Sequence, residues 1–160
     1  MAQALAERLP RAAHVRGDVF RRMIVSGRAE YRPGASGEAS AQLRLRYRLS
    51  AATADAYAES GFTAVVRDVV LGEDLTAYVG LVRSRPLYVV VLAPDPGTVA
   101  AREAARAKTG YDGEAWTIPA LDEALRTSTP RIGLWLDTSA LTPAQTVEAI
   151  LAGRERARVL

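Results

Sequence analysis

The sequence predicts an α/β protein with a parallel sheet covered by helices on both faces. Three short runs are almost wholly apolar, which is typical of strands buried on both sides: FTAVV (62–66), LYVVVL (87–92) and IGLWL (132–136). Segments with helical composition and helix-capping residues alternate with these runs along the chain. Because ligands of parallel sheets bind at the carboxyl ends of the strands, the polar residues that follow each strand are the first candidates for a site.

The first forty residues predict a helix, a short strand and a second helix. The helix covers 3–9 and ends before Pro10, and the strand covers 13–16. Asp18 is expected to cap a helix that begins at Val19 and ends near Gly27. Residues 31–40 have the composition of a loop.

The segment LRLRYRL (43–49) allows two interpretations. Taken alone it alternates apolar and polar residues, as a strand does. Taken with the alanine-rich residues that follow, it has helical spacing, which favours a long helix through Glu59 that Gly61 closes. A further helix is predicted over 73–84 and ends before Pro86.

The second half of the chain continues the alternation of strands and helices. We expect a helix over 98–107, a mobile segment over 108–118 and a short helix over 119–126. Thr142 is expected to cap a last helix, with Pro143 at its first position.

Composition excludes several classes of function. The 160 residues contain no cysteine, which excludes disulfides, thiolate catalysis and cysteine-based zinc sites. The only histidine, His14, lacks the partners of a catalytic triad and is interpreted as structural. No run reaches the roughly 18 apolar residues of a membrane span, and the N-terminus does not resemble a secretory signal, so a cytoplasmic location is expected.

The net charge of +3 comes almost entirely from arginine, because Lys108 is the only lysine. The arginines are scattered and form no basic run with interleaved aromatic residues, so nucleic-acid binding is not favoured. Several of them are instead candidates for binding phosphate groups of a small molecule.

Four segments together resemble the P-loop kinase superfamily: HVRGDVFRRM (14–23), GFTAVVRDVVL (61–71), LYVVVLAPDPGTVAAREAARAKTGY (87–111) and GLWLDTSALTPAQTVEAIL (133–151). The likeness is greatest to the small phosphotransferases grouped with chloramphenicol phosphotransferase, gluconate kinase and adenylylsulfate kinase. It rests mainly on the order and spacing of the motifs. It implies one P-loop kinase-like domain over 1–160, with a parallel sheet, helices on both faces and a short lid at about 101–128.

The phosphate-binding loop of this superfamily, GxxxxGK[ST], does not occur in the sequence, which has no Gly-Lys pair. The resemblance implies that the loop, and a central strand between the runs at 62–66 and 87–92, would precede Met1. Such a segment would add roughly 10–25 residues, the length of a strand and a phosphate loop. A deliberate truncation and a natural relic that no longer binds ATP are the alternatives.

Two carboxylates and an arginine acquire roles from the resemblance. Asp18 matches the carboxylate that holds the acceptor hydroxyl and acts as its base, although a plain helix cap is the alternative. Arg21 matches an arginine that contacts substrate or phosphate, and a solvated side chain is the alternative. Asp68 matches the acid that holds magnesium.

The implied lid and nucleotide site lie in the second half of the chain. Arg102, Arg106 and Lys108 match lid cations that close on the phosphates. Asp137 and Thr138 match the turn beneath the adenine. A solvated helix face and a simple turn are the respective alternatives.

These residues predict an ATP-dependent O-phosphotransferase that acts on a small hydroxylated molecule and uses Mg²⁺. The loop that would hold the triphosphate is absent, so we expect these 160 residues alone to be inactive. The alternatives are a non-catalytic relic or binding module and, less favoured, a kinase of polynucleotide ends. The sequence identifies neither the acceptor nor the oligomeric state.

Overall fold

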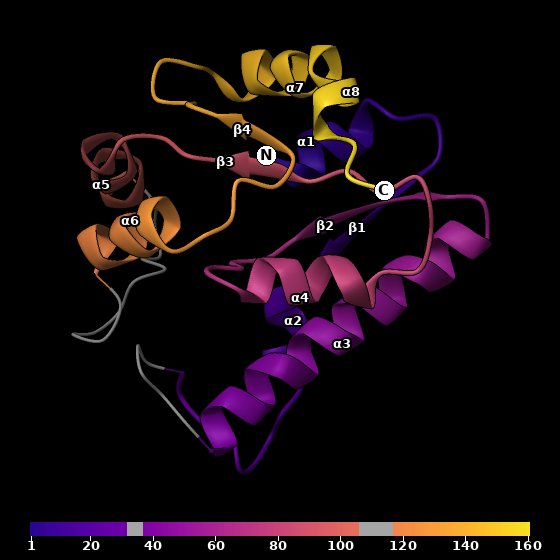
Figure 1. Ribbon diagram of the computed structural model, residues 1–160, viewed down its shortest axis with the longest axis vertical. Coiled ribbons are helices and arrows are strands. Elements are labelled where there is room, and N and C mark those ends of the chain that lie inside the picture. The colour runs from indigo at the N-terminus through magenta and orange to yellow at the C-terminus, as the bar shows by residue number, and fades with distance from the viewer. Residues whose placement is uncertain (32–36, 106–116) are drawn as a thin grey trace. The chain divides into compact units, whose positions relative to one another are not determined.

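The computed structural model describes residues 1–31, 37–105 and 117–160, and it is a mixed α/β protein with parallel strands (Figure 1). The chain forms two compact units. Unit 1 contains Met1–Val70 and Thr76–Arg85, and unit 2 contains Leu71–Leu75 and Pro86–Leu160. The predicted α/β class is therefore confirmed, whereas a single P-loop kinase-like domain stays a prediction.

The described strands form two separate two-stranded sheets instead of the continuous sheet that the sequence predicts. In unit 1, β1 (Ala12–Arg16) pairs in parallel with β2 (Thr63–Arg67). In unit 2, β3 (Val90–Leu92) pairs in parallel with β4 (Leu134–Leu136).

The helices of unit 1 follow the predicted order. They are α1 (Ala2–Glu7), α2 (Gly17–Arg22), α3 (Glu38–Glu59) and the greater part of α4 (Asp74–Leu81). The ambiguous segment at 43–49 is helical, and Gly61 follows α3 with a φ of 82°, in the left-handed region that favours glycine. The helical interpretation is thus confirmed, and α3 begins five residues before the segment that suggested it.

Figure 1 shows α3 running along one side of the β1–β2 pair. Its inward face is buried and consists of small and aromatic side chains: Tyr47, Ser50, Ala51 and Ala54. Small residues let the helix approach the strands closely, because little side-chain volume separates the two backbones. The hydroxyl of Ser50 lies 2.9 Å from that of Tyr78 on α4, so the same face also holds α4.

Asp55 holds in place the segment that follows α4. Its side chain is 2% exposed and accepts hydrogen bonds from the backbone N–H groups of Arg83 at 3.1 Å and Ser84 at 2.9 Å. Burial raises the pKa of this carboxyl, but the hydrogen bonds from Ser84 and Arg83 outweigh burial and lower the pKa below its usual value. The carboxylate therefore stays charged and ties the middle of α3 to the end of α4.

Unit 2 contains α5 (Pro96–Ala104), α6 (Ile118–Thr127), α7 (Pro143–Ala152) and α8 (Arg154–Ala157). The predicted cap at Thr142 is confirmed, since its side chain accepts a hydrogen bond from the N–H of Gln145 at 3.2 Å. The Gln145 side chain accepts one from the N–H of Thr142 at 2.9 Å, which completes a capping box. The predicted mobile segment at 108–118 falls mainly outside the described residues.

Several local predictions are wrong. Helix α2 ends at Arg22 instead of near Gly27, and the run 132–136 forms a strand only over Leu134–Leu136. Asp18 does not cap α2, because the helix starts directly at the strand end and Arg16 occupies the cap position. Asp18 instead lies in the first turn, where an acid is favourable. The run 87–92, predicted to be a buried strand, forms a strand only over Val90–Leu92, and its side chains are half-buried.

A two-stranded sheet has two outward edges, and the backbone groups on those of β2 and β3 can be assigned from the hydrogen bonds. The N–H of Thr63 donates to Arg11 at 2.8 Å, and the backbone groups of a parallel strand alternate in direction, so Ala64 and Val66 face away from β1. The N–H of Ala93 donates to Leu136 at 2.8 Å, so by the same alternation Leu92 faces away from β4. Within the described ranges neither outward edge pairs with another strand.

No helix in the described part of the chain is both long enough and apolar enough to cross a bilayer.

The open edge of β2 predicts a hydrogen-exchange pattern. The N–H of Val65 is directed at β1, so we expect the amides of Ala64 and Val66 to exchange at least about tenfold faster than that of Val65. Residue-resolved exchange by NMR measures this, with Thr63 as the protected reference. Equal protection at the three positions would mean that this edge is paired.

Candidate functional site

The carboxyl ends of β1 and β2 bring Asp18 and Asp68 to the same edge of the unit 1 sheet. The register pairs Arg16 with Arg67, the last residue of each strand. Asp18 follows two residues after Arg16, and Asp68 follows directly after Arg67. This is the edge at which parallel sheets bind ligands.

Asp68 is held by a buried ion pair with Arg46 of α3. The Arg46 guanidinium forms two hydrogen bonds to the carboxylate, of which the one from Nε to Oδ2 measures 3.0 Å. The side chains are 2% exposed for Asp68 and 17% exposed for Arg46. The N–H of Val69 donates to Oδ1 at 2.8 Å. Both oxygens of Asp68 are therefore already engaged by the protein.

Gly17 allows this arrangement because it has no side chain. A Cβ atom at this position would lie 1.8 Å from Oδ2 of Asp68, well inside contact distance. The carboxylate of Asp68 therefore rests against the backbone at the end of β1, and this contact joins the two strand ends.

Asp18 is more accessible than Asp68, with 32% of its side chain exposed. Its Oδ2 accepts a hydrogen bond from Arg22, one turn further along α2. Burial raises the pKa of this carboxyl, but the hydrogen bond from Arg22 and the charges of Arg22, Arg16 and Arg67 lower it overall, so Asp18 is ionised at neutral pH.

The other oxygen of Asp18 has no hydrogen-bond donor among the described residues. Oδ1 is shielded from solvent, and its nearest cation is Nε of Arg16 at 3.9 Å, beyond hydrogen-bonding distance. An unsatisfied carboxylate oxygen is costly, but this atom is shielded, so a ligand would approach Asp18 at the exposed part of its side chain.

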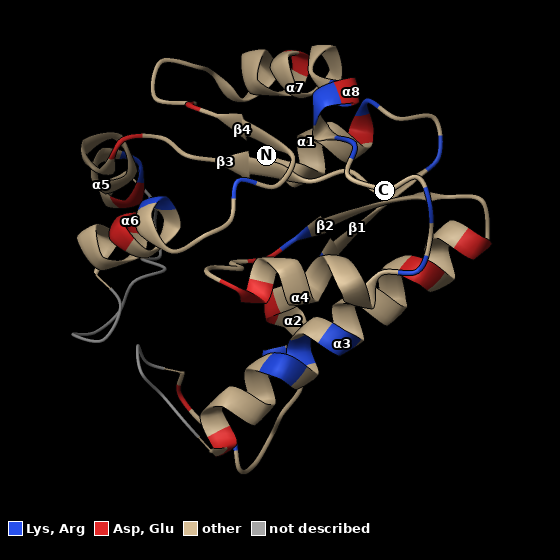
Figure 2. Ribbon diagram, in the orientation of Figure 1, with Lys and Arg blue, Asp and Glu red and all other residues tan. Residues whose placement is uncertain are grey.

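Arginines outnumber acids around this edge. Arg16 and Arg67 are exposed, and burial and the charges of both arginines lower the pKa of His14. Arg21 forms an ion pair with Glu30 and is one-third exposed. In Figure 2 the basic positions of α2 and the middle of α3 lie close together, and all belong to unit 1. The edge is therefore suited to a ligand with negative charge.

The residues of this edge do not fit a magnesium ion. Both oxygens of Asp68, the expected ligand, are engaged by Arg46 and by the N–H of Val69. Across the described ranges no group of three or more histidine or acidic side chains is arranged to hold a metal.

In unit 2, Arg102 holds the loop after β4. Its guanidinium donates to the backbone oxygens of Thr138 at 2.6 Å and Leu141 at 3.3 Å. Asp137 accepts a hydrogen bond from the N–H of Ser139 at 2.9 Å, as in an Asx turn. These contacts place three of the five predicted nucleotide-site residues, Arg102, Asp137 and Thr138, around one structured turn.

Arg106 and Lys108 lie outside the described residues, as does the middle of the predicted lid.

Arg46 is the residue that sequence reasoning missed. It lies in the segment 43–49, whose strand-like alternation does not show on which face of the element the Arg46 side chain lies. The helical phase offers a signal, because Arg46 adjoins Tyr47 at the border of the inward face.

No family model matches the sequence, and a search of curated proteins finds no significant match.

The two arginine–aspartate pairs predict unequal effects on stability. Arg46→Met should lower the free energy of unfolding by about 3 kcal/mol or more, because it leaves the buried carboxylate of Asp68 uncompensated. Arg22→Met, which removes an exposed partner of Asp18, should cost less than about 1 kcal/mol. Urea denaturation monitored by circular dichroism measures both. Equal losses would show that the Arg46–Asp68 pair is not buried in solution.

Proposed function

We propose that this chain is the acceptor-binding body of an O-phosphotransferase that acts on a small hydroxylated molecule. The proposal rests on one observation: Asp18, an ionised carboxylate whose side chain is one-third exposed, lies at the carboxyl edge of a parallel strand pair among arginines. Hydroxyl acceptors of phosphoryl transfer are positioned by such a carboxylate.

In this proposal Asp18 accepts a hydrogen bond from the acceptor hydroxyl and orients it. Arg16 and Arg67 bind a negatively charged group on the same molecule, since both are exposed and their charges reach Asp18. A hydroxy acid or a phosphorylated polyol carries both features. Asp68 serves to position this edge through Gly17, without contacting the acceptor.

The division of the strands into a β1–β2 pair and a β3–β4 pair gives further support. The resemblance places a central strand between the runs at 62–66 and 87–92, and within the described ranges the outward edges of β2 and β3, which belong to these runs, pair with no strand. A kinase draws its phosphoryl group from MgATP, and among the described residues no group of three or more histidine or acidic side chains is arranged to hold the metal. The role proposed for them is therefore limited to acceptor binding, and we expect no turnover from these 160 residues.

A non-catalytic binding protein is the second candidate. It is favoured by the engagement of Asp68 with Arg46, which removes the expected magnesium ligand. The two candidates share the acceptor site and differ in phosphoryl transfer. Incubation of the natural gene product with MgATP and a bound acceptor, followed by mass spectrometry of the acceptor, distinguishes them, because only a kinase adds a phosphoryl group.

Acceptor binding predicts a specific effect of Asp18→Asn. In a ligand-observed NMR screen of hydroxy acids and sugar phosphates, we expect this variant to lose at least about tenfold in affinity, the value of one charge-assisted hydrogen bond. Asp122→Asn is the matched control, because it also removes an acid paired with an arginine one turn away on a helix. Unchanged affinity of Asp18→Asn would exclude Asp18 from the site.

A further inference from the structure

Helix α3 has a second apolar face, opposite to the one that packs on the strands. Leu45 is 36% exposed and Leu49 is 40% exposed, large values for leucines within a helix. Ala52 and Ala56 are also exposed and continue the same line. Their spacing of four, three and four residues is that of a seam between two helices. We call Leu45, Leu49, Ala52 and Ala56 the α3 seam.

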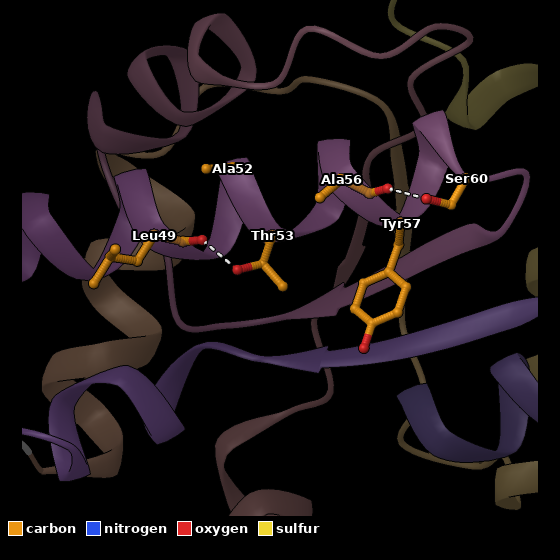
Figure 3. Close-up of a pocket in the computed structure, with 6 residues that line it drawn as sticks. All are labelled: Leu49, Ala52, Thr53, Ala56, Tyr57 and Ser60. Atoms are coloured by element: carbon orange, nitrogen blue, oxygen red, sulfur yellow. Dashed lines mark hydrogen bonds between the residues drawn. The ribbon is translucent and has the colours of Figure 1, made fainter.

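An open hollow of about 470 Å³ lies on this face, and the described residues that line it belong to α3: Leu49, Ala52, Thr53, Ala56, Tyr57 and Ser60 (Figure 3). The hydroxyl of Thr53 donates to the Leu49 carbonyl at 2.8 Å, and that of Ser60 donates to the Ala56 carbonyl at 2.9 Å. The polar side chains of the hollow are thus bonded within the helix itself. The surface that remains for a partner is mainly methyl groups and the 44%-exposed Tyr57 ring.

Charged residues flank the seam on one side, with opposite signs at its two ends. Arg44 and Arg48 are exposed and precede the middle of the seam in the sequence, and Glu59, also exposed, follows it. By the 3.6-residue repeat, Arg48 and Glu59 lie within about 20° of each other around the helix. Glu59 is 65% exposed, and its contact with Arg83 at 3.4 Å joins two solvated side chains.

We propose that the α3 seam binds the same seam of a second copy of this chain, with the two helices antiparallel. A pair centred on Ala52 and Thr53 sets Leu45 against Ser60 of the second copy and Leu49 against Ala56 of the second copy. The residues at the centre are small, so the helices approach to about 8 Å, the short end of helix-packing distances. The side chains of Leu45 and Leu49 then occupy the space left by the small side chains of Ser60 and Ala56 of the second copy.

The charges beside the seam favour a second copy of this chain as the partner and an antiparallel arrangement of the two helices. In the antiparallel pair Glu59 of each copy lies beside Arg48 of the other, and symmetry makes this contact twice. In a parallel pair the two-fold axis would run along the helices, so Arg48 and Glu59 of the two copies would lie on opposite faces and would form no such contacts. A surface whose two halves carry complementary charge around an apolar centre is self-complementary, which is the requirement for a two-fold interface.

The dimer is expected to be weak and reversible. The seam from Leu45 to Ser60 spans about 24 Å of helix, at 1.5 Å per residue. One helix from each copy gives an interface at the small end of the range, so we expect a dissociation constant on the order of 10–100 μM. This inference is independent of the proposed function, since none of the seam residues contributes to the Asp18 edge.

Charge reversal tests the proposal by sedimentation equilibrium of the full chain up to about 0.5 mM, well above the expected dissociation constant. Glu59→Arg should weaken dimerisation at least about tenfold, because two attractive contacts become repulsive together. Arg48→Glu should have the same effect. The double variant Arg48→Glu/Glu59→Arg should restore affinity to within about threefold of the unmodified chain, since each pair is again opposite in sign.

Two substitutions of alanine, one at the centre of the seam and one outside it, test the role of the apolar centre. Ala52→Glu places two carboxylates at the crossing point and should abolish dimerisation. Ala41→Glu is the matched control, because Ala41 is an exposed alanine of the same helix that lies beyond the end of the second copy's α3. This variant should leave dimerisation unchanged. Circular dichroism verifies that each variant folds. A chain that is monomeric throughout would overturn the proposal, as would a dimer that the charge reversals leave unaffected.

Discussion

The ion pair between Arg46 and Asp68 is the interaction on which the rest of unit 1 depends. It joins α3 to the end of β2, and the carboxylate rests on Gly17 at the end of β1. Burying two charges is costly, so the pair stabilises the fold only while its geometry is kept. This has two consequences. Asp18 is held in place because it directly follows Gly17, on which the carboxylate rests. The orientation of α3 about its own axis is also fixed, with Arg46 directed at Asp68 and the α3 seam directed outward.

The same pair changes the interpretation of Asp68. An acid at the end of an apolar strand has the position of a metal ligand, and the sequence predicts that role. The structure instead gives each of its oxygens a donor from the protein. Asp18 differs, since one of its oxygens remains without a donor among the described residues. The two carboxylates at this sheet edge therefore differ, because Asp68 is buried with both oxygens bonded, whereas Asp18 is one-third exposed and has one oxygen bonded to Arg22.

How much the sequence could predict depended on whether the signal was local. Helix caps and apolar runs act over a few residues, so Thr142, the extent of α3 and the strand at 62–66 were predicted closely. The Arg46–Asp68 pair joins residues 22 positions apart, and Arg102 joins a loop 36 positions away, so neither contact could be predicted from local pattern. The cap at Asp18 failed because helix α2 starts at the strand end without an intervening turn. The resemblance predicts a further strand beside β2 and β3, and within the described ranges no strand pairs with their outward edges, so this expectation stays a prediction.

The central claim is that the edge formed by β1 and β2 binds the acceptor, and chemical-shift mapping by NMR tests it most directly. A small hydroxylated anion is titrated into ¹⁵N-labelled protein, and the amides that shift are assigned. The account predicts that the largest changes occur at Arg16–Asp18 and Arg67–Val69, with little change at Asp137 and Thr138. Shifts concentrated on the β4–α7 loop, with none at the β1–β2 edge, would contradict it.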